Sequence, residues 1–217
     1  MPFLLINKPK NWTSFDVITY LRKILKIKKI GHSGTLDPFA TGLLIVGVGR
    51  ESTKKLEEFK NLPKTYLATI KLGEYSDTQD STGKIMKSRG TTRDPDFTSG
   101  HAIDDVKKVL QTFIGKQKQI PPMYSAKKIG GARLYKLARK GIEIKREPNE
   151  IEIYDIKILD YAYPQLKIEV SCGAGTYIRT LAHDIGAVLG TGAYCDELVR
   201  TKIGEYDIEQ AREVKEI

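Results

Sequence analysis

The sequence predicts a mixed α+β domain with one main core. Segments with strand-like alternation and segments with helical spacing follow one another without strict β-α-β repetition. No self-similar period of about 20–50 residues suggests a solenoid. A chain of 217 residues, 40% of them apolar, is long enough to bury one substantial core.

The N-terminal part predicts a strand and then a helix. Phe3–Ile6 is a short apolar run that ends at a Pro-containing turn, which is typical of a strand. Thr13 or Ser14 supplies a helix start signal. The apolar residues that follow have helical spacing with Lys and Arg between them, which predicts a helix with a basic outer face: Phe15, Val17, Ile18, Leu21 and Ile24.

The middle of the chain predicts a strand, a loop and a second helix. Lys64–Leu72 alternates β-branched and aromatic residues with others and stops at Gly73. The stretch Arg89–Gly100 is rich in Thr, Asp, Gly and Pro, so it is interpreted as a loop. An amphipathic pattern over Ile103–Ile114 predicts a helix with Gly115 as its C-cap.

The C-terminal part predicts a further strand and two helices. Leu166–Cys172 alternates and ends at a glycine-rich turn. Helical spacing then runs over Thr176–Leu189 and stops before Gly190. The last segment, Ile208–Ile217, is interpreted as one short helix.

The charge of the chain favours a polyanionic partner. The net charge is +9 with a pI near 9.3, and basic surfaces bind phosphates with release of condensed counterions. A merely soluble basic protein is an equally good interpretation of charge alone. The segment from Pro121 to Arg146, however, contains eight basic residues and only one acid, Glu143, which is the strongest local charge bias in the chain.

Several classes of protein are not indicated. There is no run of about 18 apolar residues and no signal-peptide pattern at the N-terminus, so we expect a cytoplasmic protein that does not enter a membrane. The two cysteines, Cys172 and Cys195, have no zinc spacing and do not form a disulfide framework. Three scattered histidines do not suggest a metal site, so we expect no metal.

The most unusual passage is Gly31–Val46. Its glycines and proline fix the backbone path, and Asp37 before Pro38 is biased away from the α region. A loop of this kind can present a carboxylate to a ligand. On local sequence alone, the preferred interpretation is that Asp37 caps either a turn or a helix that starts at Pro38.

This passage resembles the signature of the TruB family of tRNA pseudouridine synthases. Further blocks of that family occur in the family's order, and the resemblance covers almost the whole chain: Ile6–Pro9 with Trp12–Ser14, Lys64–Tyr66, Gly73–Asp80, Gln119–Lys127 and Cys172–Leu181.

The resemblance implies the fold and the domain organisation. The expected fold is the pseudouridine synthase fold, with a mixed, mainly antiparallel sheet flanked by helices. Residues 1–217 are then a single catalytic domain, in which the segment 119–146 is a basic thumb loop. Many relatives continue into a C-terminal RNA-binding PUA domain, and we expect none here.

The resemblance also implies the activity, which is isomerisation of the uridine at position 55 in the T loop of tRNA. Asp37 matches the catalytic aspartate, which acts covalently on a flipped nucleotide. Arg179 matches the arginine that holds this carboxylate. The alternative is a surface arginine near the start of a helix, where the helix dipole disfavours a cation. Tyr66 matches the tyrosine that stacks on the target base and is a candidate for removing a proton.

Other residues match substrate-binding positions of the family. His32 corresponds to a histidine that enters the T loop, and Tyr177 and Leu198 to residues that close the uracil pocket, although core packing predicts nearly the same residue types. The expected RNA-binding residues are Lys8, Lys64, Lys127, Arg133 and Arg139. Isomerisation requires no cofactor, and we expect a monomer that acts on the T arm.

The sequence is also compatible in part with three other functions. A guide-RNA-dependent relative normally has an N-terminal extension and a further C-terminal domain, so we expect no guide RNA. A catalytically idle tRNA-folding chaperone using the same pocket stays open as the alternative function. An acid–base hydrolase lacks an evident second carboxylate.

Overall fold

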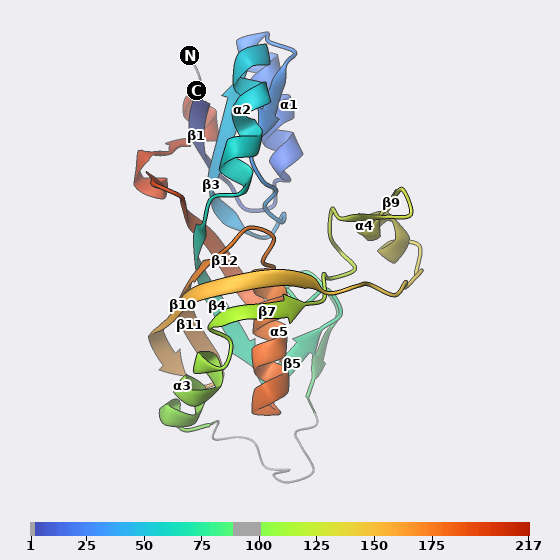
Figure 1. The fold of residues 1–217 in the computed structure, drawn as a ribbon, viewed down its shortest axis with the longest axis vertical. Coiled ribbons are helices and arrows are strands. Elements are labelled where there is room, and N and C mark those ends of the chain that lie inside the picture. Colours follow the sequence, from blue (N-terminus) through green and yellow to red (C-terminus); the bar gives the residue numbers. More distant parts are fainter. Residues whose placement is uncertain (1–2, 89–100) are drawn as a thin grey trace. The chain divides into compact units, whose positions relative to one another are not determined.

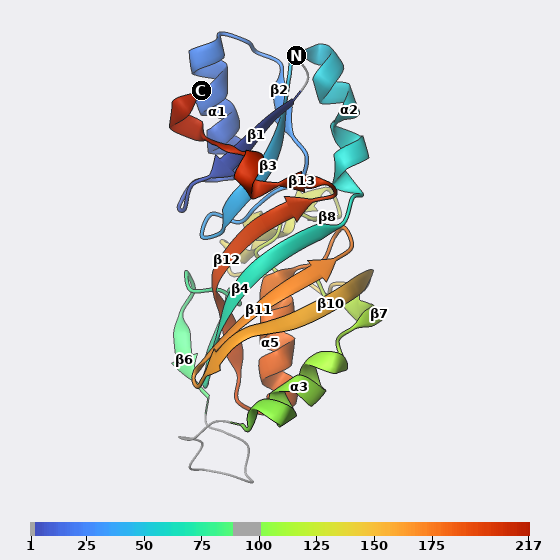
Figure 2. The same cartoon turned by 90° about the vertical axis from the view of Figure 1, so that its left-hand side faces the viewer.

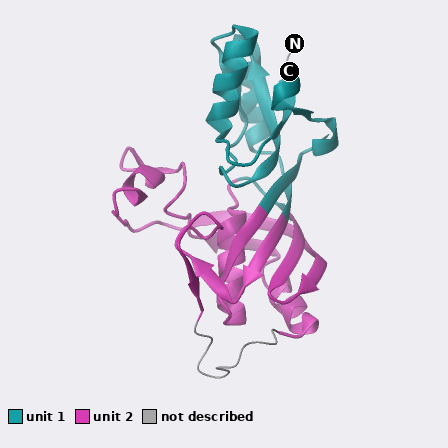
Figure 3. Ribbon diagram, turned by 180° about the vertical axis from the view of Figure 1, so that it is seen from behind, with its two compact units in different colours: residues 1–67, 171–174, 198–217 teal, residues 68–170, 175–197 magenta. Residues whose placement is uncertain are grey.

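The computed structural model describes residues 3–88 and 101–217, which form two compact units (Figures 1 and 3). Unit 1 contains residues 1–67, 171–174 and 198–217, and unit 2 contains residues 68–170 and 175–197. Three strands contribute residues to both units: β4 (Lys64–Leu72), β11 (Gln165–Cys172) and β12 (Ala193–Ile203). The prediction that 1–217 is a single domain stays a prediction.

Unit 1 is built on strands in the order β14-β1-β3-β12. Antiparallel pairing joins β1 to β3 and β2 to β3, whereas β12 runs parallel to β3 and β14 runs parallel to β1. The remaining elements of this unit are β1 (Phe3–Lys8), α1 (Ser14–Leu25), β2 (Ile30–His32), β3 (Thr41–Val48), α2 (Arg50–Lys60), β13 (Tyr206–Asp207) and β14 (Arg212–Glu213), with short 3₁₀ turns at Ile208–Gln210 and Val214–Glu216.

Both faces of the unit 1 sheet are buried, because neighbouring residues of a strand point to opposite sides. One cluster packs Ile6, Leu44 and Val46 against α1. A second cluster on the other side combines Leu43 and Ile45 with Phe59 of α2 and Ile203 of β12. Thus β3 is buried along almost its whole length, which fixes the position of the loop that precedes it.

Unit 2 contains strands in the order β4-β11-β10-β7, with α5 on one face of this sheet and α3 near its end (Figure 2). Buried residues alternate along β4 and β11, as a sheet with one packed face requires. The other elements of the unit are β5 (Glu74–Ser76), β6 (Ile85–Lys87), α3 (Ile103–Gln111), β7 (Gly115–Gln119), β8 (Lys128–Ile129), β9 (Ala132–Arg133), α4 (Leu134–Ala138), β10 (Asn149–Ala162) and α5 (Ile178–Leu189).

The fold class is confirmed as a mixed, mainly antiparallel α+β structure, and several elements are confirmed with it. β1 extends the predicted strand to Lys8, and β4 has the predicted bounds. Thr13 caps α1, in a capping box with Asp16. β11 begins one residue before the prediction, and α5 begins at Ile178 and ends against Gly190 in the left-handed conformation.

Two predicted helices are wrong in extent or type. α3 ends at Gln111 with Thr112 as its cap, because the chain turns there and Gly115, at φ +103°, already begins β7. The segment 208–217 is not one helix, since Arg212 and Glu213 form β14 beside Ile6 and Asn7 of β1. The predicted loop Arg89–Gly100 lies outside the described residues. No described helix is long and apolar enough to cross a membrane.

Candidate active site

The loop that carries Asp37, residues 33–40, is held against the first turn of α1. The Ser14 hydroxyl accepts a hydrogen bond from the Leu36 N–H at 2.9 Å and lies 3.3 Å from the Leu36 carbonyl oxygen, to which it donates. Leu36 and Phe39 are buried and anchor the loop on either side of Asp37, which is half-buried. No helix starts at Pro38, so that alternative is wrong; a turn closes from the Ala40 N–H to the Asp37 carbonyl.

Lys8 fixes the same loop from the end of β1. Its buried ammonium donates to the carbonyl oxygens of Pro9 at 2.9 Å, Trp12 at 2.6 Å and Pro38 at 3.4 Å. Burial lowers the pKa of Lys8 to about 8, while the nearby Asp37 carboxylate acts in the opposite direction. These contacts describe a positioning role for Lys8, and RNA binding by Lys8 stays a prediction.

The lowered pKa of Lys8 has a measurable consequence. An unfolded lysine keeps its proton up to about pH 10.5, whereas folded Lys8 releases it near pH 8. Between these values the unfolded state binds more protons, so stability rises with pH. We expect the free energy of unfolding of the wild type to rise from pH 8 to about pH 10 relative to Lys8→Met, in urea titrations.

The control for this experiment is Lys10→Met, which replaces an exposed lysine of the following turn. The wild type and Lys10→Met are expected to have the same slope of stability against pH. A slope for Lys8→Met that also equals that of the wild type would contradict the assignment, because Lys8 would then titrate alike in both states.

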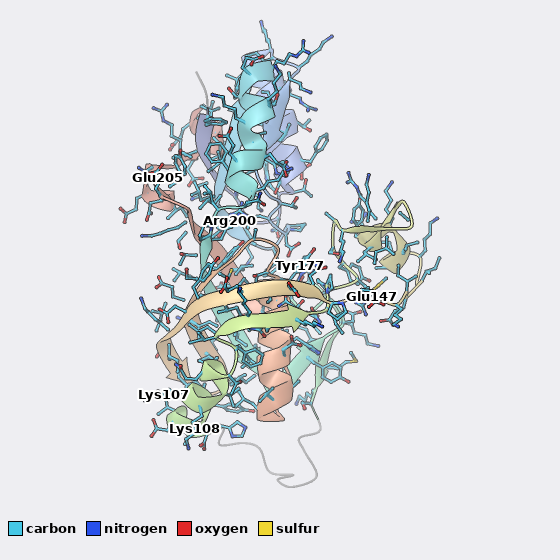
Figure 4. The ribbon with its side chains drawn as sticks, in the orientation of Figure 1. Lys107, Lys108, Glu147, Tyr177, Arg200 and Glu205 are labelled. Carbon is cyan, nitrogen blue, oxygen red and sulfur yellow. The ribbon has the colours of Figure 1, made fainter. Side chains whose placement is uncertain are left out.

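Arg200 of β12 joins the Asp37 loop to β3 and to Tyr66. Its side chain is 2% exposed, and its guanidinium donates from Nε to the Leu43 carbonyl at 2.8 Å and from Nη2 to the Gly34 carbonyl at 3.2 Å. It is also hydrogen-bonded to the Tyr66 hydroxyl. A buried guanidinium with several fixed acceptors brings a positive field to this part of unit 1. Figure 4 labels Arg200.

Tyr66 lies buried on β4, as its alternation predicts. Burial raises the pKa of its phenol above the ordinary value near 10, although the hydrogen bond from Arg200 acts against this rise. Tyr66 is therefore a neutral phenol in this structure. Removal of a proton by Tyr66 would require an ionised phenol and therefore a lowered pKa, and both parts of its predicted role stay predictions.

Three further predicted residues belong to unit 1. His32 ends β2 with a pKa lowered by burial and by Arg200, so a neutral ring suited to stacking is expected near pH 7. Leu198 is buried on β12 two residues before Arg200, and thus on the same face of the strand. The Lys64 ammonium donates to the carbonyls of Phe59 at 3.3 Å and Leu62 at 2.6 Å, at the end of α2.

Arg179 is in unit 2, in the first turn of α5. It is 3% exposed, so it is not the surface arginine of the alternative interpretation. Its Nη1 lies 3.4 Å from Oδ2 of Asp80, and its Nη2 donates to the Tyr124 carbonyl at 2.5 Å. Asp80 is buried, and its Oδ1 accepts from the Thr78 hydroxyl and from the Thr82 N–H. Pairing of Arg179 with Asp37, which belongs to unit 1, stays a prediction.

Tyr177 precedes α5 and is fixed through its backbone. The Gln119 side-chain amide accepts from the Tyr177 N–H at 2.8 Å and donates to the Tyr177 carbonyl at 3.0 Å. Gln119 is 4% exposed, so this two-point contact is shielded from water. It fixes the backbone of the half-buried Tyr177, which Figure 4 labels.

The thumb segment 119–146 folds as a small hairpin followed by α4 (Figure 1). Gly130 and Gly131 connect β8 and β9 with φ of +57° and +82°, the pair of positive values that a type I′ turn requires. Arg133 and Arg139 are exposed, and the Arg139 guanidinium lies 5.5 Å from the Tyr135 ring centroid. Lys127 donates to the Asn149 side chain, so it is only partly available.

The structure thus groups the predicted residues within each unit. Asp37, Tyr66 and His32 share unit 1 with Lys8, Lys64 and Leu198, whereas Arg179, Tyr177 and the thumb belong to unit 2. Sequence reasoning missed Arg200 and gave Asp80 and Gln119 no role of their own. A signal for Arg200 was present, since it lies two residues after Leu198 and two before Lys202 in a segment that alternates as a strand does.

Comparison with solved structures identifies the class of the fold. The chain superposes on the protein chain of a crystal structure of a Cbf5–Nop10–Gar1 complex with a TM-score of 0.72 and 27% identity, over 98% of this chain and 52% of that one. A structure of an H/ACA RNP bound to a substrate RNA containing 2′-deoxyuridine gives a TM-score of 0.70 at 25% identity, over 98% and 51%. The chain therefore spans about half the length of these solved chains, and its fold is the pseudouridine synthase fold.

Comparison with sequence families is more specific. The N-terminal domain of TruB family pseudouridylate synthases matches residues 22–178, and the C-terminal domain of tRNA pseudouridylate synthase B matches residues 179–217. The chain is 46% identical to a protein of Clostridium tetani named tRNA pseudouridine synthase B, over 98% of this chain and 71% of that protein. It is 44% identical to a protein of the same name from Bacteroides fragilis, over 95% of this chain and 88% of that protein. The chain belongs to the TruB family, whose activity is that of a pseudouridine synthase, an isomerase.

Proposed function

We propose that this enzyme isomerises the uridine at position 55 in the T loop of tRNA to pseudouridine. The observation that carries the proposal is the half-buried Asp37 on a loop fixed by Ser14, Lys8 and Arg200. A carboxylate held in this way loses little freedom when a substrate binds, which is what a nucleophile requires. The name of the relatives, tRNA pseudouridine synthase B, supports tRNA as the substrate.

The chemistry is an isomerisation in which atoms balance without any cofactor. The target nucleotide leaves the stack and enters the site, where ionised Asp37 attacks either the base or the ribose. The bond between N1 and C1′ breaks, the uracil rotates, a bond forms between C5 and C1′, and the bond to Asp37 breaks, which returns the free carboxylate. C5 then loses a proton and N1 gains one, so the product has the composition of the substrate.

The other residues of the site bind and position the nucleotide. Arg179 holds the Asp37 carboxylate in its charged form, Tyr66 stacks on the uracil, and Tyr177 and Leu198 close the pocket. His32 is the neutral ring that takes up stacking space in the T loop. Arg200 and Lys8 are positioning residues, since their partners are carbonyls of the Asp37 loop and its neighbours.

The thumb supplies the contacts to the phosphate backbone of the T arm. Its exposed arginines, Arg133 and Arg139, present charge at the two ends of α4, and Lys127 adds a further charge. Lys64 is the first residue of β4, and its ammonium donates to the Leu62 carbonyl just after α2; RNA binding by Lys64 stays a prediction. The enzyme acts as a monomer, without guide RNA, in the cytoplasm where tRNA matures.

The test uses unmodified tRNA labelled with [5-³H]uridine, because formation of pseudouridine releases tritium from C5. We expect the wild-type enzyme to release one equivalent of tritium per tRNA. The matched control is the same tRNA with cytidine at position 55, from which no release is expected. Equal release from both RNAs would refute the position, and release from neither would refute the proposed substrate.

A further inference from the structure

A cluster of lysines at the C-terminal end of α1 lies apart from the site described above. Lys23, Lys26, Lys28 and Lys29 are all exposed, and we call them the α1 lysine patch. No acidic residue occurs between Asp16 and Asp37, so this part of the chain carries an uncompensated positive charge. Nothing in the catalytic scheme uses these residues.

The patch differs from the lysine-rich faces of α2 and α3. Lys54 and Lys60 on α2 pair with Glu51 and Glu57, and Lys107 and Lys108 on α3 pair with Asp104 and Asp105. The four patch lysines form no ion pair with the described residues of the chain. Their charge is therefore available to an external anion, and a concentrated field of this kind attracts polyanions.

The backbone that carries the patch is fixed rather than loose. The Arg22 guanidinium donates to the Ile30 carbonyl at 3.0 Å, which closes the connection from α1 to β2. The Gly49 N–H donates to the Lys29 carbonyl at 2.8 Å, which ties the same connection to the end of β3. In Figure 2 this connection lies at the top of unit 1, between α1 and β2. The lysines thus extend from a defined frame.

Lys26 occupies a position where a side chain is unfavourable. It caps α1 in the left-handed conformation, with φ +55° and ψ +28°, where glycine or asparagine is usual. The left-handed region costs a residue with a side chain about 1 kcal/mol or more. Lysine here adds a charge at some cost in local stability, so the cap geometry alone does not account for this residue type.

We propose that the α1 lysine patch is a second RNA-contact surface, which binds phosphates of the substrate RNA at a distance from the target uridine. The inference rests on the proposed function, since the occupant is the same RNA. α1 has 12 residues and rises about 1.5 Å per residue, so its end lies roughly 16 Å from the turn that holds the Asp37 loop.

The first experiment compares two double variants with the same net charge. Lys28→Ala with Lys29→Ala removes two patch charges, and Lys107→Ala with Lys108→Ala removes two charges that are paired on α3. Binding of unmodified tRNA is measured by filter retention at several salt concentrations. We expect the patch variant to bind about 3- to 10-fold more weakly at low salt, with a slope of log affinity against log salt smaller by about 2.

The second experiment uses Lys26→Gly, which removes a charge and relieves the left-handed strain together. We expect weaker tRNA binding while the melting temperature stays the same or rises. At saturating RNA, tritium release by this variant should equal that of the wild type, since the patch does not touch the reacting atoms. The change should therefore be in KM and not in kcat.

Three results would overturn the proposal. They are equal loss of affinity in the two double variants, no loss in the patch variant, or a Lys26→Gly enzyme that is less stable but binds tRNA normally. The last would mean that the lysines serve only the helix dipole. Because filter retention reports bound RNA whether or not the uridine has been isomerised, failure of the isomerase proposal would leave this comparison intact.

Discussion

Replacing Gly42 by alanine is expected to destabilise the enzyme by about 3 kcal/mol or more, because the new Cβ would clash with the backbone of a neighbouring strand. Gly42, the second residue of β3, pairs directly with Arg200 of the parallel strand β12. A Cβ at this position would lie 2.4 Å from the Arg200 carbonyl oxygen and 2.6 Å from its nitrogen. Both are backbone atoms, so the strands themselves must separate, and the Arg200 contacts to Leu43 and Gly34 are lost with them.

The matched control is Gly49→Ala in the same unit. Gly49 also has a positive φ, +87° against +109° at Gly42, but no atom lies within 4 Å of a Cβ added there. Its replacement should cost only backbone strain, about 1–2 kcal/mol. Urea unfolding of the two variants separates strain from collision. Equal losses of stability would contradict the close pairing of Gly42 with Arg200.

Local chemistry explains why parts of the fold could be predicted. The Thr13 capping box is formed with Asp16, only three residues away, so the start of α1 was readable. β4 follows its alternation from Lys64 to Leu72 because every second residue of the strand is buried. Neither feature depends on distant parts of the chain.

Long-range pairing explains the errors. β14 exists because Arg212 and Glu213 pair with Ile6 and Asn7, about 200 positions earlier in the chain, and no local pattern reveals such a partner. α3 was overextended because amphipathic spacing continues past Gln111, while Gly115 already belongs to β7.

The candidate site was predictable where it resembles a family motif and not where it depends on buried contacts. Asp37, Tyr66 and Arg179 were named from their motifs. Arg200 acts through the carbonyls of Leu43 and Gly34, which are more than 150 positions away, so its role required the structure. The internal partners of Lys8 and Lys64 could not be foreseen either, because a lysine in a sequence is expected to be solvated.

Replacing Asp37 by asparagine is expected to lower the rate of isomerisation by about 10³-fold or more. Asparagine has nearly the same shape and keeps the backbone carbonyl that closes the turn at Asp37, so the loop should keep its structure. What is lost is the negative charge and the capacity to form a covalent bond to the nucleotide. Glu205→Gln, which removes an exposed carboxylate from the same unit, should have no effect on the rate.

The most direct measurement is single-turnover release of tritium from unmodified tRNA labelled with [5-³H]uridine, with each enzyme in excess over RNA. The account predicts complete release by the wild type and by Glu205→Gln, and almost none by Asp37→Asn, which should still bind tRNA and unfold at the wild-type urea midpoint. Release by Asp37→Asn within tenfold of the wild-type rate would contradict the assignment of Asp37 as the nucleophile.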